Sequence, residues 1–99
     1  MPGSTLRTRV EQHRHELKRV LEELGASNIR LLGSVARGDD TSESDVDLLV
    51  DVDEKVSLFA LGRMRREAER VLCVPVDIVP SNSLKPELAE TVLTEAIPL

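Results

Sequence analysis

The sequence is poor in cysteine, in aromatic residues and in long apolar runs, and each shortage excludes a class of protein. Cys73 is the single cysteine, so an internal disulfide and a thiolate zinc cage are both excluded. Phe59 is the single aromatic residue, which removes the stacking platforms that single-strand nucleic-acid binders use. No stretch approaches the roughly 20 apolar residues that span a membrane, and no signal-peptide core is visible. We therefore expect a cytoplasmic protein.

The length and charge of the chain predict one acidic domain over residues 1–99. At this size a globular chain buries roughly 65% of its unfolded surface, which allows one hydrophobic core. The 40% of hydrophobic residues agrees with this expectation. Thirteen basic residues against eighteen acidic ones give a net charge of −5, which argues against a broad nucleic-acid interface. A polyphosphate would have to be held locally, by metal ions or by a few fixed donors.

The spacing of apolar residues predicts helices that alternate with short strands. Helical spacing runs from Thr5 to Leu24, and β-type runs cover 29–32, 46–52 and 74–79. Small and acidic residues over 38–44 predict a loop. We expect an α/β fold, a small mixed β-sheet flanked by helices, with its core within about 6–79. A helix over 57–72 would connect two strands by a crossover.

Two helices in the second half of the sequence each have an apolar face. Ser57 can cap the helix over 57–72. Its expected buried stripe consists of Leu58, Leu61, Met64, Ala68, Val71 and Leu72. Pro86 stands in the first turn of a last helix over 86–97. The apolar stripe of that helix consists of Leu88, Ala89, Val92, Leu93, Ala96 and Ile97. This stripe either packs on the sheet or is covered by a partner or a second copy, which would make a homodimer.

Carboxylates are placed where an apolar strand would not need them. Asp45 and Asp47 are two residues apart, so they project from one face and repel each other unless a cation lies between them. Oxygen ligands on a rigid strand suit Mg²⁺. Asp77 lies inside the apolar run 74–79 and would join the pair if the two strands are neighbours. Three carboxylates can hold two Mg²⁺ about 4 Å apart, the arrangement of phosphoryl and nucleotidyl transfer.

A glycine and a serine end the strand over 29–32 and form a candidate phosphate site. Gly33 would let a phosphate approach the backbone, and Ser34 offers a hydroxyl and an amide at the start of a helical turn. Arg37, one turn later, can reach a phosphate oxygen. Beside the carboxylates, these residues predict a cradle for a nucleoside triphosphate next to a two-metal site.

The spacing of these motifs resembles a known signature. Gly33-Ser34, ten intervening residues and Asp45-Val46-Asp47 are similar to the signature of the DNA polymerase beta-like nucleotidyltransferase superfamily. The string GSVARGDDTSESDVDLLV resembles its minimal nucleotidyltransferase branch, which has a small mixed sheet. The resemblance implies that Gly33-Ser34 holds the triphosphate of ATP and that Asp45 and Asp47 bind both Mg²⁺. It also implies that Asp77 is the third carboxylate, which activates the acceptor hydroxyl, and that Arg37 contacts the nucleotide.

The same resemblance implies a protein partner. Minimal members commonly pair with a HEPN-domain protein, as antitoxin and ribonuclease toxin, and in some pairs the antitoxin transfers AMP from ATP to a tyrosine of the toxin. The chain lacks the second domain with which antibiotic-modifying transferases build an acceptor wall, so a protein acceptor is expected. Two other functions stay open: an antitoxin that acts by binding alone, and a subunit of a small-molecule nucleotidyltransferase.

Several of these residues also have ordinary structural interpretations. The paired aspartates could be solvated on an edge strand, and Asp77 could be a buried, ion-paired carboxylate. Arg37 could form a salt bridge with Asp39 or Asp40. Cys73 lies between two apolar runs and is expected in the core. One helix has four arginines that form either a solvated face or a docking surface: Arg63, Arg65, Arg66 and Arg70.

Overall fold

The computed structural model describes residues 5–41 and 44–99. Within these ranges four strands form one sheet in the order β3-β2-β1-β4. β1 (Ala26–Leu32) is antiparallel to β2 (Val46–Val52) and to β4 (Ile97–Pro98), whereas β2 and β3 (Val76–Pro80) are parallel. The predicted small mixed sheet is confirmed, and β3 forms one edge of it in the described part of the chain.

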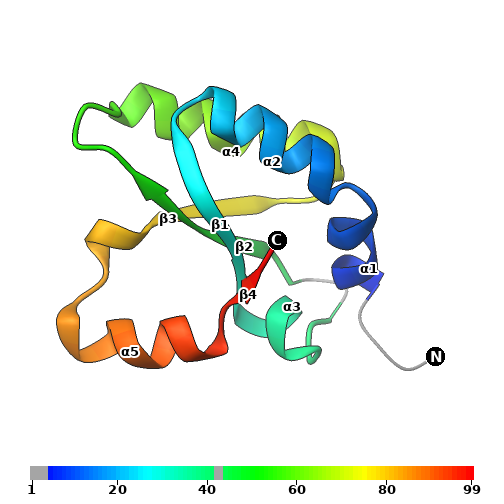
Figure 1. Cartoon of the computed structure of the whole chain (residues 1–99). Helices are drawn as coiled ribbons and strands as arrows, with labels where there is room; N and C mark the ends of the chain where they lie inside the picture. Colours follow the sequence, from blue (N-terminus) through cyan, green and yellow to red (C-terminus); the bar gives the residue numbers. More distant parts are fainter. Residues whose placement is uncertain (1–4, 42–43) are drawn as a thin grey trace.

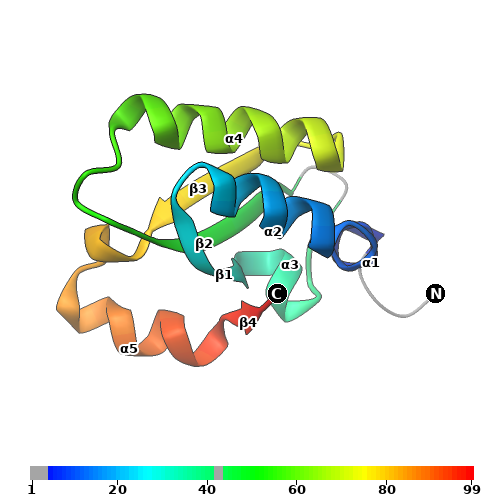
Figure 2. The same ribbon diagram turned by 45° about the horizontal axis from the view of Figure 1, so that its top comes forward.

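Helices cover both faces of this sheet, as Figure 1 shows. α2 (Arg14–Glu23) and α4 (Leu58–Leu72) pack against each other on one face, and they run side by side in Figure 2. α5 (Pro86–Glu95) lies on the opposite face. The short α3 (Gly33–Arg37) follows β1 directly, and the 3-10 turn η1 (Ser81–Ser83) follows β3. The flanking helices were predicted. In the sequence, α4 connects the two parallel strands, β2 and β3.

The main core lies between the sheet and the helix pair α2 and α4. The fully buried side chains of β2 on this face are Val46, Leu48 and Val50. α4 adds buried residues from the predicted stripe: Met64, Ala68, Val71 and Leu72. The Ser57 hydroxyl accepts a hydrogen bond from the Ala60 amide at 3.2 Å, so the predicted cap is present. The alternation of β2 thus directs its aspartates away from this core.

The predicted first helix is two helices. α1 (Thr5–Gln12) and α2 are separated by His13, whose φ of −109° and ψ of 12° interrupt the helical geometry. The Nδ1 atom of His13 lies 2.9 Å from the carbonyl oxygen of Arg9, which is a local contact that accompanies the break. Because apolar spacing continues across His13, periodicity alone predicted one continuous helix.

Two predicted boundaries in the second half are wrong. β3 begins at Val76 and includes Pro80, which an edge strand tolerates because its outer side needs no ladder hydrogen bond. The last helix ends at Glu95, because Ala96 is extended with φ −68° and ψ 142°. Ile97 then pairs with Leu31 in β4 instead of extending the helix. Of the predicted loop, residues 38–41 and 44 lack helix and strand, and residues 42 and 43 lie outside the described residues.

Two expectations about burial are also corrected, those for Leu58 and Cys73. Leu58 is 85% exposed, because the first turn of α4 extends beyond the sheet. Cys73, which ends α4 in the left-handed region with φ +58°, is exposed. None of the residues of α5, all of which the structure describes, is fully buried, and Leu88 and Leu93 are 53% and 48% exposed. No helix within the described ranges is long and apolar enough to cross a membrane.

Candidate active site

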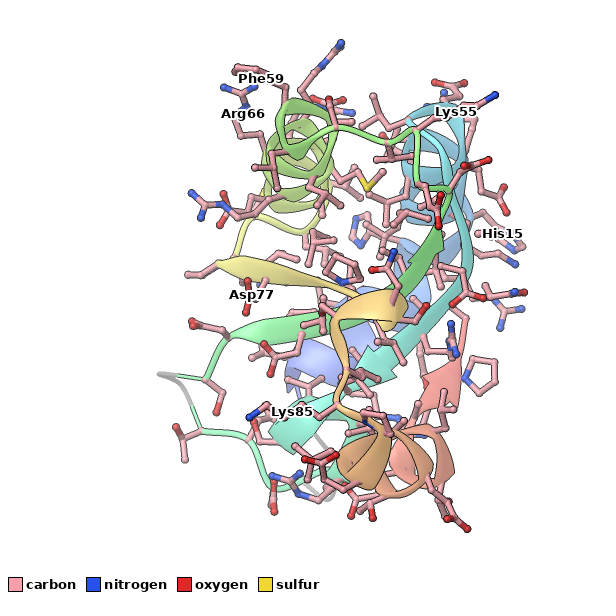
Figure 3. The ribbon with its side chains drawn as sticks, turned by 90° about the vertical axis from the view of Figure 1, so that its left-hand side faces the viewer. His15, Lys55, Phe59, Arg66, Asp77 and Lys85 are labelled. Carbon is pink, nitrogen blue, oxygen red and sulfur yellow. The ribbon has the colours of Figure 1, made fainter. Side chains whose placement is uncertain are left out.

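Two of the three predicted carboxylates occupy paired positions on neighbouring strands. Asp47 of β2 lies opposite Asp77 of β3 in the parallel register, and such strands are about 4.8 Å apart. Asp47 is half-buried, whereas Asp77 is exposed at the sheet edge, between the layers of α4 and α5 (Figure 3). Asp45 directly precedes β2 and is exposed. The strands are neighbours, as the prediction for Asp77 required.

The environment of Asp47 disfavours its negative charge. Burial raises the pKa of the Asp47 carboxyl above its ordinary value, and the charges of Asp77 and Asp45 raise that pKa further. A cation between these groups would remove both the repulsion and part of the burial cost. The electrostatics of Asp47 therefore favour a bound proton or a bound metal ion.

Gly33 lies directly against Asp47. Leu32 and Asp47 are register partners in β1 and β2, so the end of β1 brings the next residue to the carboxylate. Gly33 has φ +73°, and a β-carbon on it would lie 2.6 Å from Oδ2 of Asp47. Only glycine combines this backbone conformation with this close approach. The predicted phosphate site and the carboxylate pair are thus one continuous site.

α3 holds Ser34 at the same place. Val35 and Ala36 are buried and fix this five-residue helix against the sheet. Ser34 is partly exposed, and its carbonyl oxygen accepts a hydrogen bond from the Asp39 amide at 3.0 Å. Within residues 5–41 and 44–99 the Ser34 hydroxyl has no hydrogen-bond partner, so it can donate to a ligand.

Arg37 is already ion-paired at the other end of α3. Its Nε donates to Oδ2 of Asp39 at 3.3 Å, and its Nη1 lies 3.8 Å from Oε2 of Glu95 in α5. All three side chains are half-exposed or more. The salt bridge with Asp39 was one of the structural interpretations of the sequence. The contact with Glu95 was missed, because no sequence signal places α5 beside α3.

A cavity of about 260 Å³ opens beside this cluster. Its walls come from α3, the three longer strands and α5, and consist of Leu32, Gly33, Arg37, Asp47, Val79, Val92 and Glu95. Sites that enclose a whole small ligand usually measure about 300–1,000 Å³. The cavity is therefore smaller than a site that encloses a whole ligand of that kind.

The donor chemistry of this cluster fits Mg²⁺. Asp45, Asp47 and Asp77 offer oxygen ligands alone, and two of them are in register on rigid strands. In the part of the chain that the structure describes, no three His, Cys, Asp or Glu side chains are grouped as a complete metal-ligand set. The metal-binding roles of the three aspartates therefore stay predictions.

Sequence comparison identifies related proteins of one class. The family described as "Nucleotidyltransferase domain" matches residues 11–99. Protein adenylyltransferase MntA of Thermococcus cleftensis is 39% identical over 85 residues, which cover 86% of this chain and 83% of that protein.

Structural comparison agrees with the sequence matches. A structure assigned to a minimal nucleotidyltransferase superposes with a TM-score of 0.86 and 41% identity, covering 97% of both chains. A variant of the toxin-antitoxin MntA-HpeT gives a TM-score of 0.69 and 26% identity, over 90% of this chain and 70% of that chain. The similarity extends through the strands and α3, which position the aspartates and Gly33.

Proposed function

This chain belongs to the nucleotidyltransferase domain family, and on that premise we propose that it transfers AMP from ATP to a hydroxyl group of another protein. The observation that best supports the proposal is the register pair of Asp47 and Asp77, with Gly33 against the first carboxylate. A protein acceptor is supported by the similarity to a protein adenylyltransferase. ATP as the donor is supported by the same relative, whose name describes an adenylyltransferase.

The proposal gives each residue of the cluster a separate task. Asp45, Asp47 and Asp77 would hold two Mg²⁺, which when bound neutralise the triphosphate and polarise the attacking and leaving oxygens. Gly33 and the Ser34 hydroxyl would hold the triphosphate beside the carboxylates. Arg37 would exchange its exposed contacts with two carboxylates for a phosphate oxygen, which costs little because surface ion pairs are weak.

In this proposal Asp77 receives the proton of the acceptor. It is exposed at the edge of the sheet, whereas Asp47 is half-buried behind it. The acceptor hydroxyl would transfer its proton to the Asp77 carboxylate while its oxygen bonds to the α-phosphorus of ATP. The bond from that phosphorus to the bridging oxygen breaks, and pyrophosphate leaves. A positioned base of this kind contributes about 10²–10⁴-fold to the rate.

We infer that the acceptor is the toxin of a toxin-antitoxin pair and that this chain is the antitoxin. The similarity to the toxin-antitoxin MntA-HpeT supports this inference, and the resemblance in the sequence implies a HEPN-domain ribonuclease as the toxin. A tyrosine hydroxyl of that protein is then the acceptor. The exposed position of Asp77 supports a large acceptor, because the carboxylate lies at the surface and not in a closed pocket.

Transfer of labelled AMP tests this function. The chain is incubated with MgATP labelled at the α-phosphate and with a HEPN-domain protein encoded beside it. We expect label on that protein, and Asp77→Asn should lower the rate about 10²–10⁴-fold. Asp47→Asn should abolish transfer, whereas Asp53→Asn, an exposed residue beyond the end of β2, should transfer at the wild-type rate.

The results that contradict the proposal are specific. Undiminished transfer in both active-site variants would exclude these carboxylates from catalysis. A tight complex with the HEPN-domain protein but no label on it would indicate an antitoxin that acts by binding alone. Label on an aminoglycoside instead of a protein would indicate a small-molecule transferase.

A further inference from the structure

The first turns of α4 expose apolar side chains to solvent. Leu58 is 85% exposed and Phe59, the single aromatic residue of the chain, is 87% exposed. Figure 3 shows Phe59 and Arg66 on the outer side of α4, away from the sheet. Adjacent exposed apolar side chains on a helix commonly mark an interaction site.

The same turns have an excess of positive charge. Residues 58–66, LFALGRMRR, contain three arginines and no acidic residue, although the chain has a net charge of −5. Among the described residues Arg63, Arg65 and Arg66 form no direct hydrogen bond or ion pair. Arg70, and to a smaller extent the charges of Arg63 and Arg66, lower the pKa of the Glu67 carboxyl, which follows this segment. By contrast, Arg70 of the same helix pairs with Glu67 at 3.1 Å and with a glutamate of α2 at 3.8 Å. The arginines of α4 that lack a direct partner therefore lie between residues 63 and 66, next to the exposed apolar turns.

A glycine lies in this helix where no contact among residues 5–41 and 44–99 requires it. A β-carbon on Gly62 would meet nothing within 4 Å. A helix with glycine at an interior position is less stable than one with alanine there, because glycine loses more backbone freedom on folding. A close approach of another molecule to the helix backbone at this position would explain why glycine is present there despite its cost in stability.

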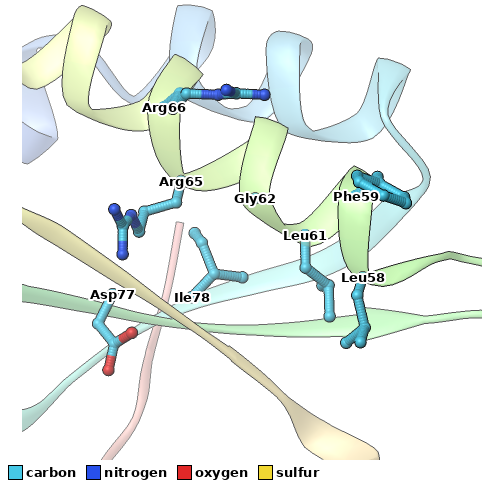
Figure 4. A pocket seen from close by; sticks show the side chains of 8 residues that line it. All are labelled: Leu58, Phe59, Leu61, Gly62, Arg65, Arg66, Asp77 and Ile78. Carbon is cyan, nitrogen blue, oxygen red and sulfur yellow. The ribbon is translucent and has the colours of Figure 1, made fainter.

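A pocket of about 400 Å³ connects this surface with the candidate active site. Its lining includes Leu58, Phe59, Gly62, Arg65, Arg66 and Asp77. In Figure 4 the Arg65 side chain extends from α4 toward the strand of Asp77, whose carboxylate points to the far side of that strand. The cavity beside Gly33 and Asp47 is lined by α5 instead, on the other face of the sheet. Both openings thus border β3, one on each face of the sheet.

We infer that the α4 surface, defined as Leu58, Phe59, Gly62, Arg65 and Arg66, docks the acceptor protein through an acidic segment that also contains apolar side chains. The role of this segment as acceptor rests on the proposed function. Carboxylates of the segment pair with the arginines, its apolar side chains cover Leu58 and Phe59, and its backbone approaches Gly62. The segment then crosses the β3 edge and presents its hydroxyl to Asp77. The nucleotide occupies the α5 side.

Peptide binding without ATP tests the surface separately from catalysis. The probes are a fluorescein-labelled 12-residue peptide of glutamate, leucine and one tyrosine, and the same peptide with lysine for glutamate. Fluorescence anisotropy should show at least tenfold tighter binding of the acidic peptide, and higher salt should weaken it. The double variant Arg65→Glu with Arg66→Glu should weaken binding roughly 2- to 30-fold, as expected for the loss of two exposed ion pairs. The single charge reversal Arg14→Glu, at an exposed position of α2, is the control for each single arginine reversal and should bind normally.

Gly62→Ala gives a second test, with opposite expected effects on two measurements. The Tm should rise by about 4 °C, because alanine favours the helix and the site has room for its methyl group. Acidic peptide binding should weaken at least threefold, since the methyl group blocks the backbone approach. A rise in Tm with unchanged peptide affinity would show that nothing docks at this glycine and would overturn the inference.

Other results distinguish the surface from the proposed function. Equal affinity for both peptides, or tighter binding of single-stranded RNA or anionic vesicles than of the acidic peptide, would overturn the inference. Self-association that Phe59→Asp abolishes would assign the surface to a second copy. If the wild-type chain binds the acidic peptide through Arg65 and Arg66 but transfers no AMP, the surface stands and the proposed function fails. Normal KM for the acceptor protein in the double arginine variant would reject the surface alone.

Discussion

Replacing Gly33 by alanine should destabilise the fold through two separable effects. The backbone of Gly33 has φ +73°, and an L-residue in this region costs about 1–2 kcal/mol. In addition, the new β-carbon would lie 2.6 Å from Oδ2 of Asp47, so the carboxylate must move. Displacing a side chain from its rotamer costs about 0.5–1.5 kcal/mol. We expect Gly33→Ala to lower the free energy of unfolding by about 1.5–3.5 kcal/mol.

Gly38→Ala provides the matched control, because Gly38 differs from Gly33 only in the second effect. Its φ is +80°, and a β-carbon on it would meet nothing within 4 Å. This variant should lose only about 1–2 kcal/mol. The difference between the two variants therefore isolates the contact between Gly33 and Asp47. Urea denaturation of the metal-free proteins measures both values.

A double-mutant cycle then identifies the atom responsible. Adding Asp47→Ala to Gly33→Ala removes the carboxylate that the new methyl group displaces, so the two changes should couple by about 0.5–1.5 kcal/mol. MgATP affinity should fall in Gly33→Ala and persist in Gly38→Ala. Equal destabilisation by the two alanines, together with no coupling to Asp47, would show that Gly33 does not lie against the carboxylate as described.

Two further predictions concern pH. Since burial and, after it, neighbouring charge raise the pKa of Asp47, its ionised form destabilises the metal-free fold. Asp47→Asn should therefore raise the Tm at pH 8, and the gain should vanish as the pH falls through the raised pKa toward the ordinary aspartate value. A constant gain at all pH values would contradict this cause. The pKa of Asp51 is lowered, chiefly by hydrogen bonds from Ser81 and Asn28 and further by Arg30. Asp51 should stabilise the fold at neutral pH, so Asp51→Asn should lower the Tm by a few degrees at pH 7 and by less as the pH falls below the ordinary aspartate pKa. An unchanged Tm at pH 7 would show that these hydrogen bonds do not stabilise the fold.

Most of the fold is predictable because its signals are local. Period-two alternation identified β2, and the Ser57 cap together with helical spacing identified α4. The failures concern features that depend on distant contacts. β4 contains two residues, and it exists because Ile97 pairs with Leu31 of β1. The exposure of Leu58 likewise depends on where the sheet ends beneath α4, which no spacing of apolar residues reveals.

The candidate site divides in the same way. The types and spacing of its residues were visible in the sequence, because the glycine, the serine and the aspartates each follow or begin a short strand. The register of Asp47 with Asp77 followed from strand adjacency, which the sequence could state only as a condition. The contact of Gly33 with Asp47 and the ion pair of Arg37 with Glu95 depend on how separate segments pack. Long-range packing of this kind leaves no mark on a single sequence.

Asp77 lies on an edge strand, which could pair with a strand of another molecule. The sequence of β3 makes such pairing less favourable. A large acceptor can reach Asp77 only if the outer side of β3 stays open, yet an open edge invites pairing with another strand. β3 has five residues, and its last residue, Pro80, has no amide hydrogen to donate to such a partner. Arg65 adds a positive charge beside the strand, which also disfavours unspecific strand pairing. The edge can therefore remain open to an acidic acceptor and still resist unselective association.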